Sequence, residues 1–377
     1  NYNYFALGHI HLRQTLSEKP LIVYSGKGYE AFYKRFPKYG EWIAGRVHPT
    51  ICQIQALATF SNVPLGYIYL KNPPPLSDKE ITDFRKLNGE IADRPYSPEL
   101  RDTIYDMQIR QDWLSQYRKL NLGIDALPYV GSFSKRMDSR DLVHQAYSLL
   151  DIEAGWQIGV ADPFTYIRKR IETIDVTVFV NGIVGSNTRR KLSVDEFRGF
   201  TLIDSYAPII FINGTDSNHG RLFTIIHELC HILLGEEGVT DSSSEPYCNS
   251  FAGEFLVPES RFIPVWNEHL EDYETVAKRF KVSEYVIYRI ALEHGYITRI
   301  QYHRLVERFN QRLQSLPERE TRGGGDFYVT AHARLGESFS RTVVKAARAG
   351  ELAYRDAYEL LGLRGSTFTK YVNEYSF

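Results

Sequence analysis

The 377-residue sequence has few cysteines, no long apolar run and almost no net charge. Its three cysteines (Cys52, Cys230 and Cys248) are odd in number and far apart, which argues against a disulfide framework and for a reducing compartment. No apolar stretch is long enough to span a bilayer, and the first residues lack the basic-then-apolar order of a signal peptide. We therefore expect a cytoplasmic protein with no membrane partner.

The balance of charge argues against binding that is driven by the net charge of the whole protein. The chain has 45 Lys and Arg residues against 46 Asp and Glu, so it has no overall bias toward nucleic acid, membranes or acidic substrates, and any such binding must be local. Hydrophobic residues make up 43% of the chain, which is enough for packed cores in the two or three domains that this length favours.

Proline, glycine and hydrophobic patterning divide the chain into five parts, mostly helical. A stretch of prolines, residues 73–75, and a Gly-rich linker in ERETRGGG mark two of the boundaries. In the connector before the core, Ser97 and Pro98 predict the start of a long helix with an apolar stripe at Leu100, Ile104, Met107 and Leu114. The predicted parts are a helical region at 1–75, a helical connector at 76–135, a mixed core at 136–260, a helical extension at 261–316 and a C-terminal helical module at 326–377.

The core differs from the rest of the chain because it contains β-rich runs. The segments IDVTVFV, GFTLID and PIIFIN have the alternation or continuous apolar character of short strands. A helix is predicted from Arg221 to Leu234, closed by Gly235. A short antiparallel sheet followed by a histidine-bearing helix predicts an α+β fold.

This helix carries the sequence HELCH. His227 and His231 are four residues apart, about 40° around a helix axis and one turn along it, so two imidazoles can hold one Zn²⁺. Glu228 follows the first histidine and can reach a water at the metal without occupying a ligand position, as a general base requires. The pattern predicts metal-assisted hydrolysis with Zn²⁺, or with another divalent ion such as Mn²⁺.

The motif alone is not decisive, because H-E-x-x-H arises by chance in roughly a few per cent of chains of this length. A catalytic zinc site also needs a third protein ligand. In CNSFAGEFLVP, Glu254 shares a helical side with Phe251 and Phe255, and a metal would offset the cost of burying its carboxylate. Glu254 is therefore the expected third ligand, with Glu245 and Asp241 as alternatives.

Other polar groups near the motif are given simpler interpretations. His219 precedes the predicted helix and is a candidate for orienting substrate or an oxyanion, although a lone loop histidine is more often solvated. Cys230 and Cys248 are expected in the core. Glu236 and Glu237 follow the helix, where exposure is expected.

The motif and its surroundings resemble a known family. The run FINGTDSNHGRLFTIIHELCHILLG, followed by CNSFAGEFLVP and preceded by EFRGFTLID, resembles the ImmA/IrrE-type metallopeptidases, which combine a strand, an Arg-led HExxH helix and an N-x-F-A-x-E-x-L-x-P helix. The resemblance implies a zincin-like metallopeptidase core with His227, His231 and Glu254 as metal ligands and Glu228 as the catalytic glutamate.

Segments outside the core resemble the longer members of this family. HPTICQIQALATFSNVPLGYIYL, PPPLSDKEITDFRKL, MQIRQDWLSQY and LPYVGSF are similar to their front half, which carries a Cro/cI-type (XRE) helix-turn-helix region, and GGGDFYVTAHARLGESFSRTVVKAARAGEL is similar to their tail. The resemblance covers about residues 29 to 375. It departs at LIVYSGKGYEAFYKRFPKYG, where Gly26, Gly28 and Pro37 interrupt the early helices, so the region 1–75 is interpreted as a degenerate XRE region.

Two functions follow as hypotheses. The first is a zinc-dependent endopeptidase that cleaves a protein, most simply an XRE-type repressor, to derepress stress, prophage or mobile-element genes, with the substrate added to a strand edge. The alternative is a DNA-binding regulator, antirepressor or toxin–antitoxin component with a structural or vestigial zinc site. Helix-turn-helix-like patterns at 49–70, 274–293 and 353–373 support DNA binding, but the mixed charges of the last two favour packing over phosphate contacts.

Overall fold

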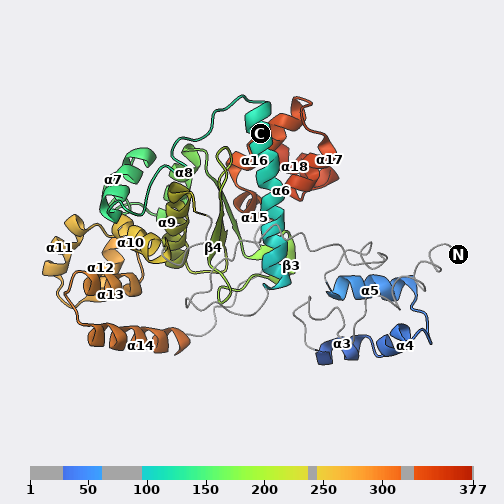
Figure 1. The fold of residues 1–377 in the computed structure, drawn as a ribbon, viewed down its shortest axis with the longest axis horizontal. Helices are drawn as coiled ribbons and strands as arrows, with labels where there is room; N and C mark the ends of the chain where they lie inside the picture. The colour runs from blue at the N-terminus through green and yellow to red at the C-terminus, as the bar shows by residue number, and fades with distance from the viewer. Residues whose placement is uncertain (1–28, 62–95, 237–243, 316–326, 376–377) are drawn as a thin grey trace. The chain divides into compact units, whose positions relative to one another are not determined.

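The computed structural model describes residues 29–61, 96–236, 244–315 and 327–375 (Figure 1). The chain forms two compact units, one with described residues 29–61 and 96–104 and the other with the described residues from 105 onward. The proline stretch 73–75, part of the helix-turn-helix-like pattern at 49–70, Glu237 and Asp241 lie outside the described residues.

The first unit contains three short helices around an aromatic core. They are α3 (Tyr29–Arg35), α4 (Tyr39–Ile43) and α5 (Ile51–Ser61). In α5, Ile54, Leu57 and Ala58 are buried, whereas Ile51 is exposed. The three buried residues pack against the aromatic side chains of Phe32, Phe36, Tyr39 and Trp42.

The long predicted helix is confirmed as α6 (Pro98–Leu120). The Oγ of Ser97 accepts a hydrogen bond from the backbone N–H of Leu100 at 3.1 Å, so the expected N-cap is present. All four residues of the predicted apolar stripe are buried. From residue 105 onward α6 belongs to the second unit.

The second unit is built on a three-stranded sheet with the order β1-β5-β4. Its strands are β1 (Thr177–Asn181), β4 (Gly199–Leu202) and β5 (Ile209–Asn213), and a separate ribbon is formed by β2 (Ile183–Val184) and β3 (Asn187–Lys191). The predicted α+β fold is confirmed. The sheet is mixed rather than purely antiparallel, because β5, buried along its whole length, inserts between β4 and β1 and pairs parallel with β1.

Helices cover both faces of this sheet, as the alternation of its side chains requires (Figure 1). Val178, Ile210 and Ile212 face the main core, which also contains the buried residues of α8 (Pro163–Thr173) and α9 (Asn218–Leu234). Phe179 faces the other side, where its ring lies 5.2 Å from Phe339 and 5.2 Å from the guanidinium of Arg110 on α6. The sheet therefore forms the middle layer of three.

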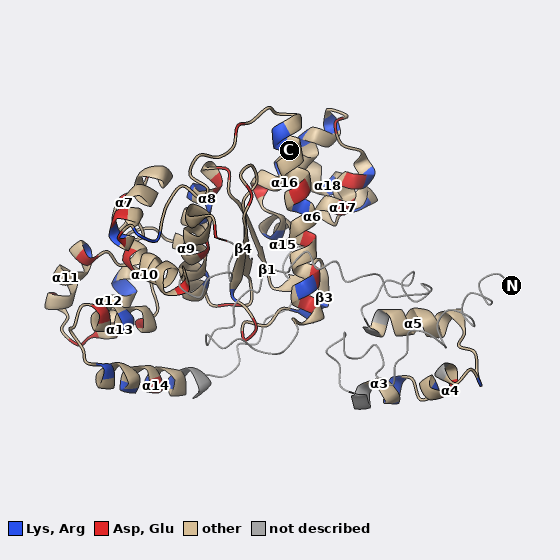
Figure 2. Ribbon diagram, in the orientation of Figure 1, with Lys and Arg blue, Asp and Glu red and all other residues tan. Residues whose placement is uncertain are grey.

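The remaining helices extend these layers. Helix α10 (Ser244–Leu256) packs against α9, and α7 (Ser139–Leu150) packs against α10. The helices that follow are α11 (Glu259–Glu268), α12 (Tyr273–Phe280), α13 (Glu284–Glu293) and α14 (Arg299–Ser315). The C-terminal module contains α15 (Phe327–Leu335), α16 (Glu337–Arg348), α17 (Tyr354–Leu361) and α18 (Gly365–Glu374), and α15 packs against β1. Basic and acidic residues are interspersed over most helices (Figure 2). Within the described part of the chain, every helix is too short or too polar to cross a membrane.

Candidate metal centre and active site

The helix that carries HELCH is held at both ends by local interactions. It begins at Asn218, three residues earlier than predicted, because Ser217 is an N-cap whose Oγ accepts a hydrogen bond from Gly220 N–H at 3.0 Å. It ends at Gly235, which adopts a left-handed conformation with φ of 68°, as the sequence predicts.

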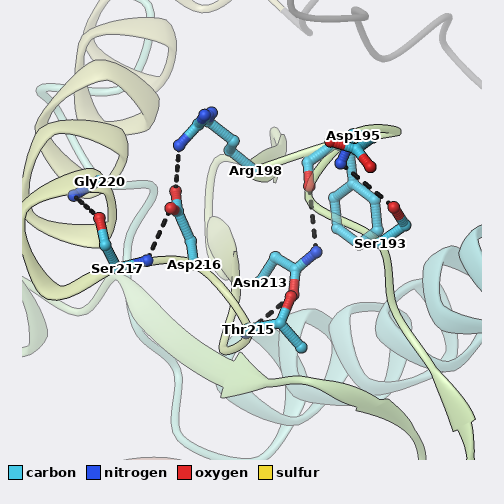
Figure 3. A network of polar contacts seen from close by, with 9 residues as sticks. Ser193, Asp195, Arg198, Asn213, Thr215, Asp216, Ser217 and Gly220 are labelled. Carbon is cyan, nitrogen blue, oxygen red and sulfur yellow. Dashed lines mark hydrogen bonds and ion pairs between the residues drawn. The ribbon is translucent and has the colours of Figure 1, made fainter. Parts of the chain in front are cut away.

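A polar network fixes the turn between β5 and α9 (Figure 3). The carboxylate of Asp216 accepts hydrogen bonds from Arg198 Nη1 and from Ser217 N–H, both at 2.7 Å. Gly220 lies directly against this carboxylate, so any Cβ at position 220 would collide with it. The network therefore sets where α9 starts relative to the strands.

Asn213 holds the two strand ends next to α9 together. Its Nδ2 donates to the carbonyl of Phe197 at 3.1 Å, and its Oδ1 accepts from the hydroxyl of Thr215 at 2.7 Å (Figure 3). The side chain is fully buried. Neither Asn213 nor Asp216 was predicted as a site residue. The polar turn FINGTDSN, directly ahead of the histidine helix, was the available signal.

Three side chains converge on the inner side of α9. The Nε2 atoms of His227 and His231 are 3.2 Å apart. The Glu245 carboxylate, from α10, lies 3.4 Å from His227 Nε2 and 3.6 Å from His231 Nε2. Atoms that bind one tetrahedral Zn²⁺ at about 2.0–2.2 Å lie about 3.3–3.6 Å from one another, so this group has the spacing and the donor types of a zinc site.

The pKa values of His231 and Glu245 are shifted by their mutual contacts. Burial lowers the pKa of His231, but contacts with Cys248 and Glu245 outweigh it and hold the pKa well above its usual value. Burial raises the pKa of Glu245, and the two histidines outweigh that effect and lower it. Without a metal, Glu245 is thus ionised beside a protonated His231, and a divalent cation would replace that proton, because metal ligation requires neutral imidazoles and an ionised carboxylate.

The expected third ligand, Glu254, does not belong to this group. Its Oε1 accepts a hydrogen bond from the backbone N–H of Glu259 at 3.1 Å and so caps the first turn of α11. Nine residues separate Glu245 from Glu254, which places them about 180° apart on α10. The structure therefore brings the weighed alternative, Glu245, to the histidines, and places Glu254 on the opposite side of the helix.

Glu228 is buried, with 7% of its surface exposed. The hydroxyl of Thr201 on β4 donates to its Oε2 at 2.7 Å. Burial raises the pKa of Glu228, and the neighbouring His227 and His231 act in the opposite direction. A carboxylate with a raised pKa next to a metal group is suited to accept a proton near neutral pH. Thr201 was not predicted as a site residue.

A close backbone approach makes room for Glu228. A Cβ on Gly199 would lie 3.3 Å from Glu228 Oε1, 2.9 Å from the carbonyl oxygen of Phe211 and 2.6 Å from Thr224 Cγ2. Position 199 therefore needs glycine because of space, not because of its backbone angles.

The other predicted residues lie as follows. His219 is exposed in the first turn of α9, eight residues and about 12 Å along the helix from His227, and the structure does not bring it to the metal group. Cys230 and Cys248 are buried free thiols, as expected for core residues. Glu236, where exposure was expected, is partly exposed and pairs with Lys135 at 3.0 Å.

Comparison with known proteins agrees with this geometry. Residues 172–290 match the family model of the IrrE N-terminal-like domain (Peptidase_M78), and residues 335–374 match a domain of unknown function, DUF8813. No curated protein matches the chain. A solved structure of a Mycobacterium tuberculosis transcriptional regulator aligns with 49% of this chain and 51% of its own at 11% identity and a TM-score of 0.27, which is too low to support an argument. The match over 172–290 confirms the resemblance for this part of the chain, which includes the histidine helix and α10 and is similar to the IrrE N-terminal-like domain.

Proposed function

We propose that this protein is a zinc-dependent endopeptidase in which His227, His231 and Glu245 hold the metal. The observation that carries the proposal is the convergence of two Nε2 atoms and one ionised carboxylate at 3.2 to 3.6 Å. Zinc in such a site polarises a carbonyl group and makes water a nucleophile at neutral pH. Mn²⁺ remains the alternative metal.

Glu228 is the general base in this proposal. Thr201 donates to Oε2, which leaves Oε1 to accept a proton from the attacking water. The same carboxyl group then passes the proton to the leaving amine of the cleaved peptide bond. Gly199 and Thr201 thus position the base, one by leaving space and the other by a hydrogen bond.

The edge of the sheet offers a place for an extended substrate. Arg198 and Asn213 pair by a hydrogen bond from Asn213 N–H to the Arg198 carbonyl at 2.8 Å, so in the antiparallel β4–β5 ladder the backbone groups of Gly199 and Thr201 point away from β5. No backbone hydrogen bond joins these groups to another described residue. A substrate segment added along β4 would place its peptide bonds beside Glu228.

A protein substrate follows from this mode of binding, and a DNA-binding repressor is the substrate that we favour. Support comes from the resemblance to ImmA/IrrE-type metallopeptidases and from the IrrE N-terminal-like match. Cleavage of such a repressor would derepress the genes it controls, whether for stress, prophage or mobile elements.

The test is cleavage of the repressor encoded beside this protein, with zinc-loaded full-length chain. We expect specific fragments from the wild type and none from Glu228→Gln, which should retain about one zinc per chain because Glu228 is not a ligand. Glu254→Gln is the matched control, since it removes a carboxylate of α10 that lies outside the metal group. Cleavage by Glu228→Gln would disprove the assigned base, and zinc binding without cleavage by the wild type would favour action by binding alone.

A further inference from the structure

Two helix pairs in this chain share one helix-turn-helix geometry. In both α12–α13 and α17–α18, a helix of eight residues is followed by a three-residue turn and a helix of ten residues. The first turn residue is left-handed in each, with φ of 55° at Lys281 and 61° at Gly362. The buried positions correspond at a constant offset of 81 residues: Val276, Phe280, Val282, Ile287 and Ile290 match Ala357, Leu361, Leu363, Phe368 and Tyr371.

In the first pair, the outer side of the second helix is used for packing. Helix α14 lies against α13. Glu284 accepts hydrogen bonds from Tyr288 and from Arg312 of α14, and the hydroxyl of Tyr302 on α14 donates to Tyr285 at 3.2 Å. An acidic side chain and a covering helix leave no surface there for a polyanion, so the packing interpretation of 274–293 holds.

In the second pair, the outer side of α18 is exposed within the described part of the chain, and its charges differ from those on the outer side of α13. Up to Asn373, its exposed side chains are cationic or neutral hydrogen-bonding groups, and the one acidic residue of the helix, Glu374, is exposed at its last position. Lys370 extends over the ring of Tyr328 at 4.6 Å and keeps its charge at the surface. Besides Gly365 and Glu374, the exposed residues are Arg364, Ser366, Thr369, Lys370 and Asn373.

We propose that α17 and α18 bind double-stranded DNA, with the outer side of α18 in the major groove. In helix-turn-helix proteins the second helix reads base edges there. Arg, Lys, Asn, Ser and Thr are the side chains that pair with those edges, and the two cations also neutralise phosphates. Two further exposed cations, Lys345 and Arg348, end the preceding helix α16. The matched region of unknown function, 335–374, would thus be a DNA-binding module.

The C-terminal module (α15 to α18) packs against α8 and the sheet of the proposed peptidase core. Arg168 of α8 donates both to the carbonyl of Ala333 at 3.2 Å and to that of Val178 on β1 at 2.8 Å. Phe339 is buried against Phe179 on the outer face of the sheet. Binding to DNA would therefore hold the proposed peptidase next to DNA-bound proteins. This consequence rests on the proposed function, whereas the proposal of DNA binding does not.

The test measures binding of full-length protein to labelled duplex DNA over a range of salt concentrations. We expect salt-dependent binding by the wild type and by Glu228→Gln alike. Arg364→Gln/Lys370→Gln removes two exposed cations of the module, so the slope of log K against log salt should fall by about 1.8 and affinity in low salt by about 100-fold. Arg304→Gln/Arg308→Gln is the matched control, because it removes two exposed cations from α14, along which basic residues are spaced (Figure 2), and it should bind as the wild type does.

A second variant separates sequence reading from charge. Ser366→Ala/Asn373→Ala keeps both cations, so it should bind random duplex like the wild type and lose the preference for a site enriched from a random duplex library. The proposal is overturned by no duplex binding in low salt, by equal loss in the α14 control, or by preferred binding to RNA or single strands. Because Glu228→Gln is included, failure here and failure of the peptidase proposal are distinguished.

Discussion

Replacing Glu245 with Gln is expected to remove most of the stabilisation that zinc gives to this protein. Its carboxylate is the one anionic member of the group, 3.4 and 3.6 Å from the two histidine Nε2 atoms. Loss of a residue that merely orients a ligand weakens metal binding about 10–100-fold, so loss of the ligand itself should weaken it at least about 100-fold. The effect should appear both in zinc affinity and in zinc-dependent thermal stability.

The size of the thermal effect follows from linkage. Free zinc at about 1,000 times the wild-type Kd stabilises the folded state by about 4.1 kcal/mol, and a 100-fold weaker site would retain about 1.4 kcal/mol. The difference of about 2.7 kcal/mol corresponds to about 5 °C in Tm for a unit of more than 200 residues. The assay compares the zinc-induced Tm shift of the wild type, Glu245→Gln and Glu254→Gln.

Glu254→Gln is the control that makes this experiment decisive. Glu254 caps α11 on the other side of α10, so its variant should show the same zinc-induced shift as the wild type, even if its metal-free Tm falls slightly. A zinc shift that survives in Glu245→Gln and disappears in Glu254→Gln would refute the structural assignment and restore the ligand expected from the motif.

Three further predictions concern the surroundings of the site and the C-terminal module. Gly199→Ala should lower the free energy of unfolding in urea by about 1–3 kcal/mol and reduce cleavage, since its Cβ would lie 2.9 Å from the Phe211 carbonyl oxygen. An unchanged free energy of unfolding would show that β4 can shift to make room for the added methyl group. Phe339→Ala should cost about 3–5 kcal/mol in the same assay, because the ring is buried against Phe179, and a cost below about 1 kcal/mol would argue against firm docking. Burial lowers the pKa of His332, so its contribution to stability is complete above about pH 6.5 and declines as the pH falls toward the lowered value. Thermal unfolding between pH 7.5 and 5 should therefore show a loss that His332→Phe reduces, and an equal loss in this variant would contradict the assignment.

Local features of the chain were predictable because their causes are local. The helix of α6 follows from Ser97, Pro98 and a regular apolar stripe, and the end of α9 follows from Gly235. The side-by-side placement of His227 and His231 follows from helix geometry alone. These interactions span at most a few turns, so neighbouring residues determine them.

The third member of the metal group was not predictable in the same way. Glu245 and Glu254 are both acidic residues of α10, and the choice between them depends on how that helix is rotated against α9. Aromatic residues beside Glu254 suggested an inward position, and Phe251 and Phe255 are indeed fully buried. The carboxylate of Glu254 instead turns to the backbone of α11, a partner that the motif did not include.

The sequence by itself determined the HELCH helix, the α+β class and the helix-turn-helix-like patterns at 274–293 and 353–373, because hydrophobic spacing and capping act within a segment. Tertiary structure alone decided that β5 lies between β1 and β4, that Thr201 meets Glu228, and that Glu245 meets the histidines. It also decided that α14 packs against α13, while the outer side of α18 is exposed within the described residues. The physical reason is the same in each case: these contacts join different helices and strands, and their free energy depends on how these elements pack against one another.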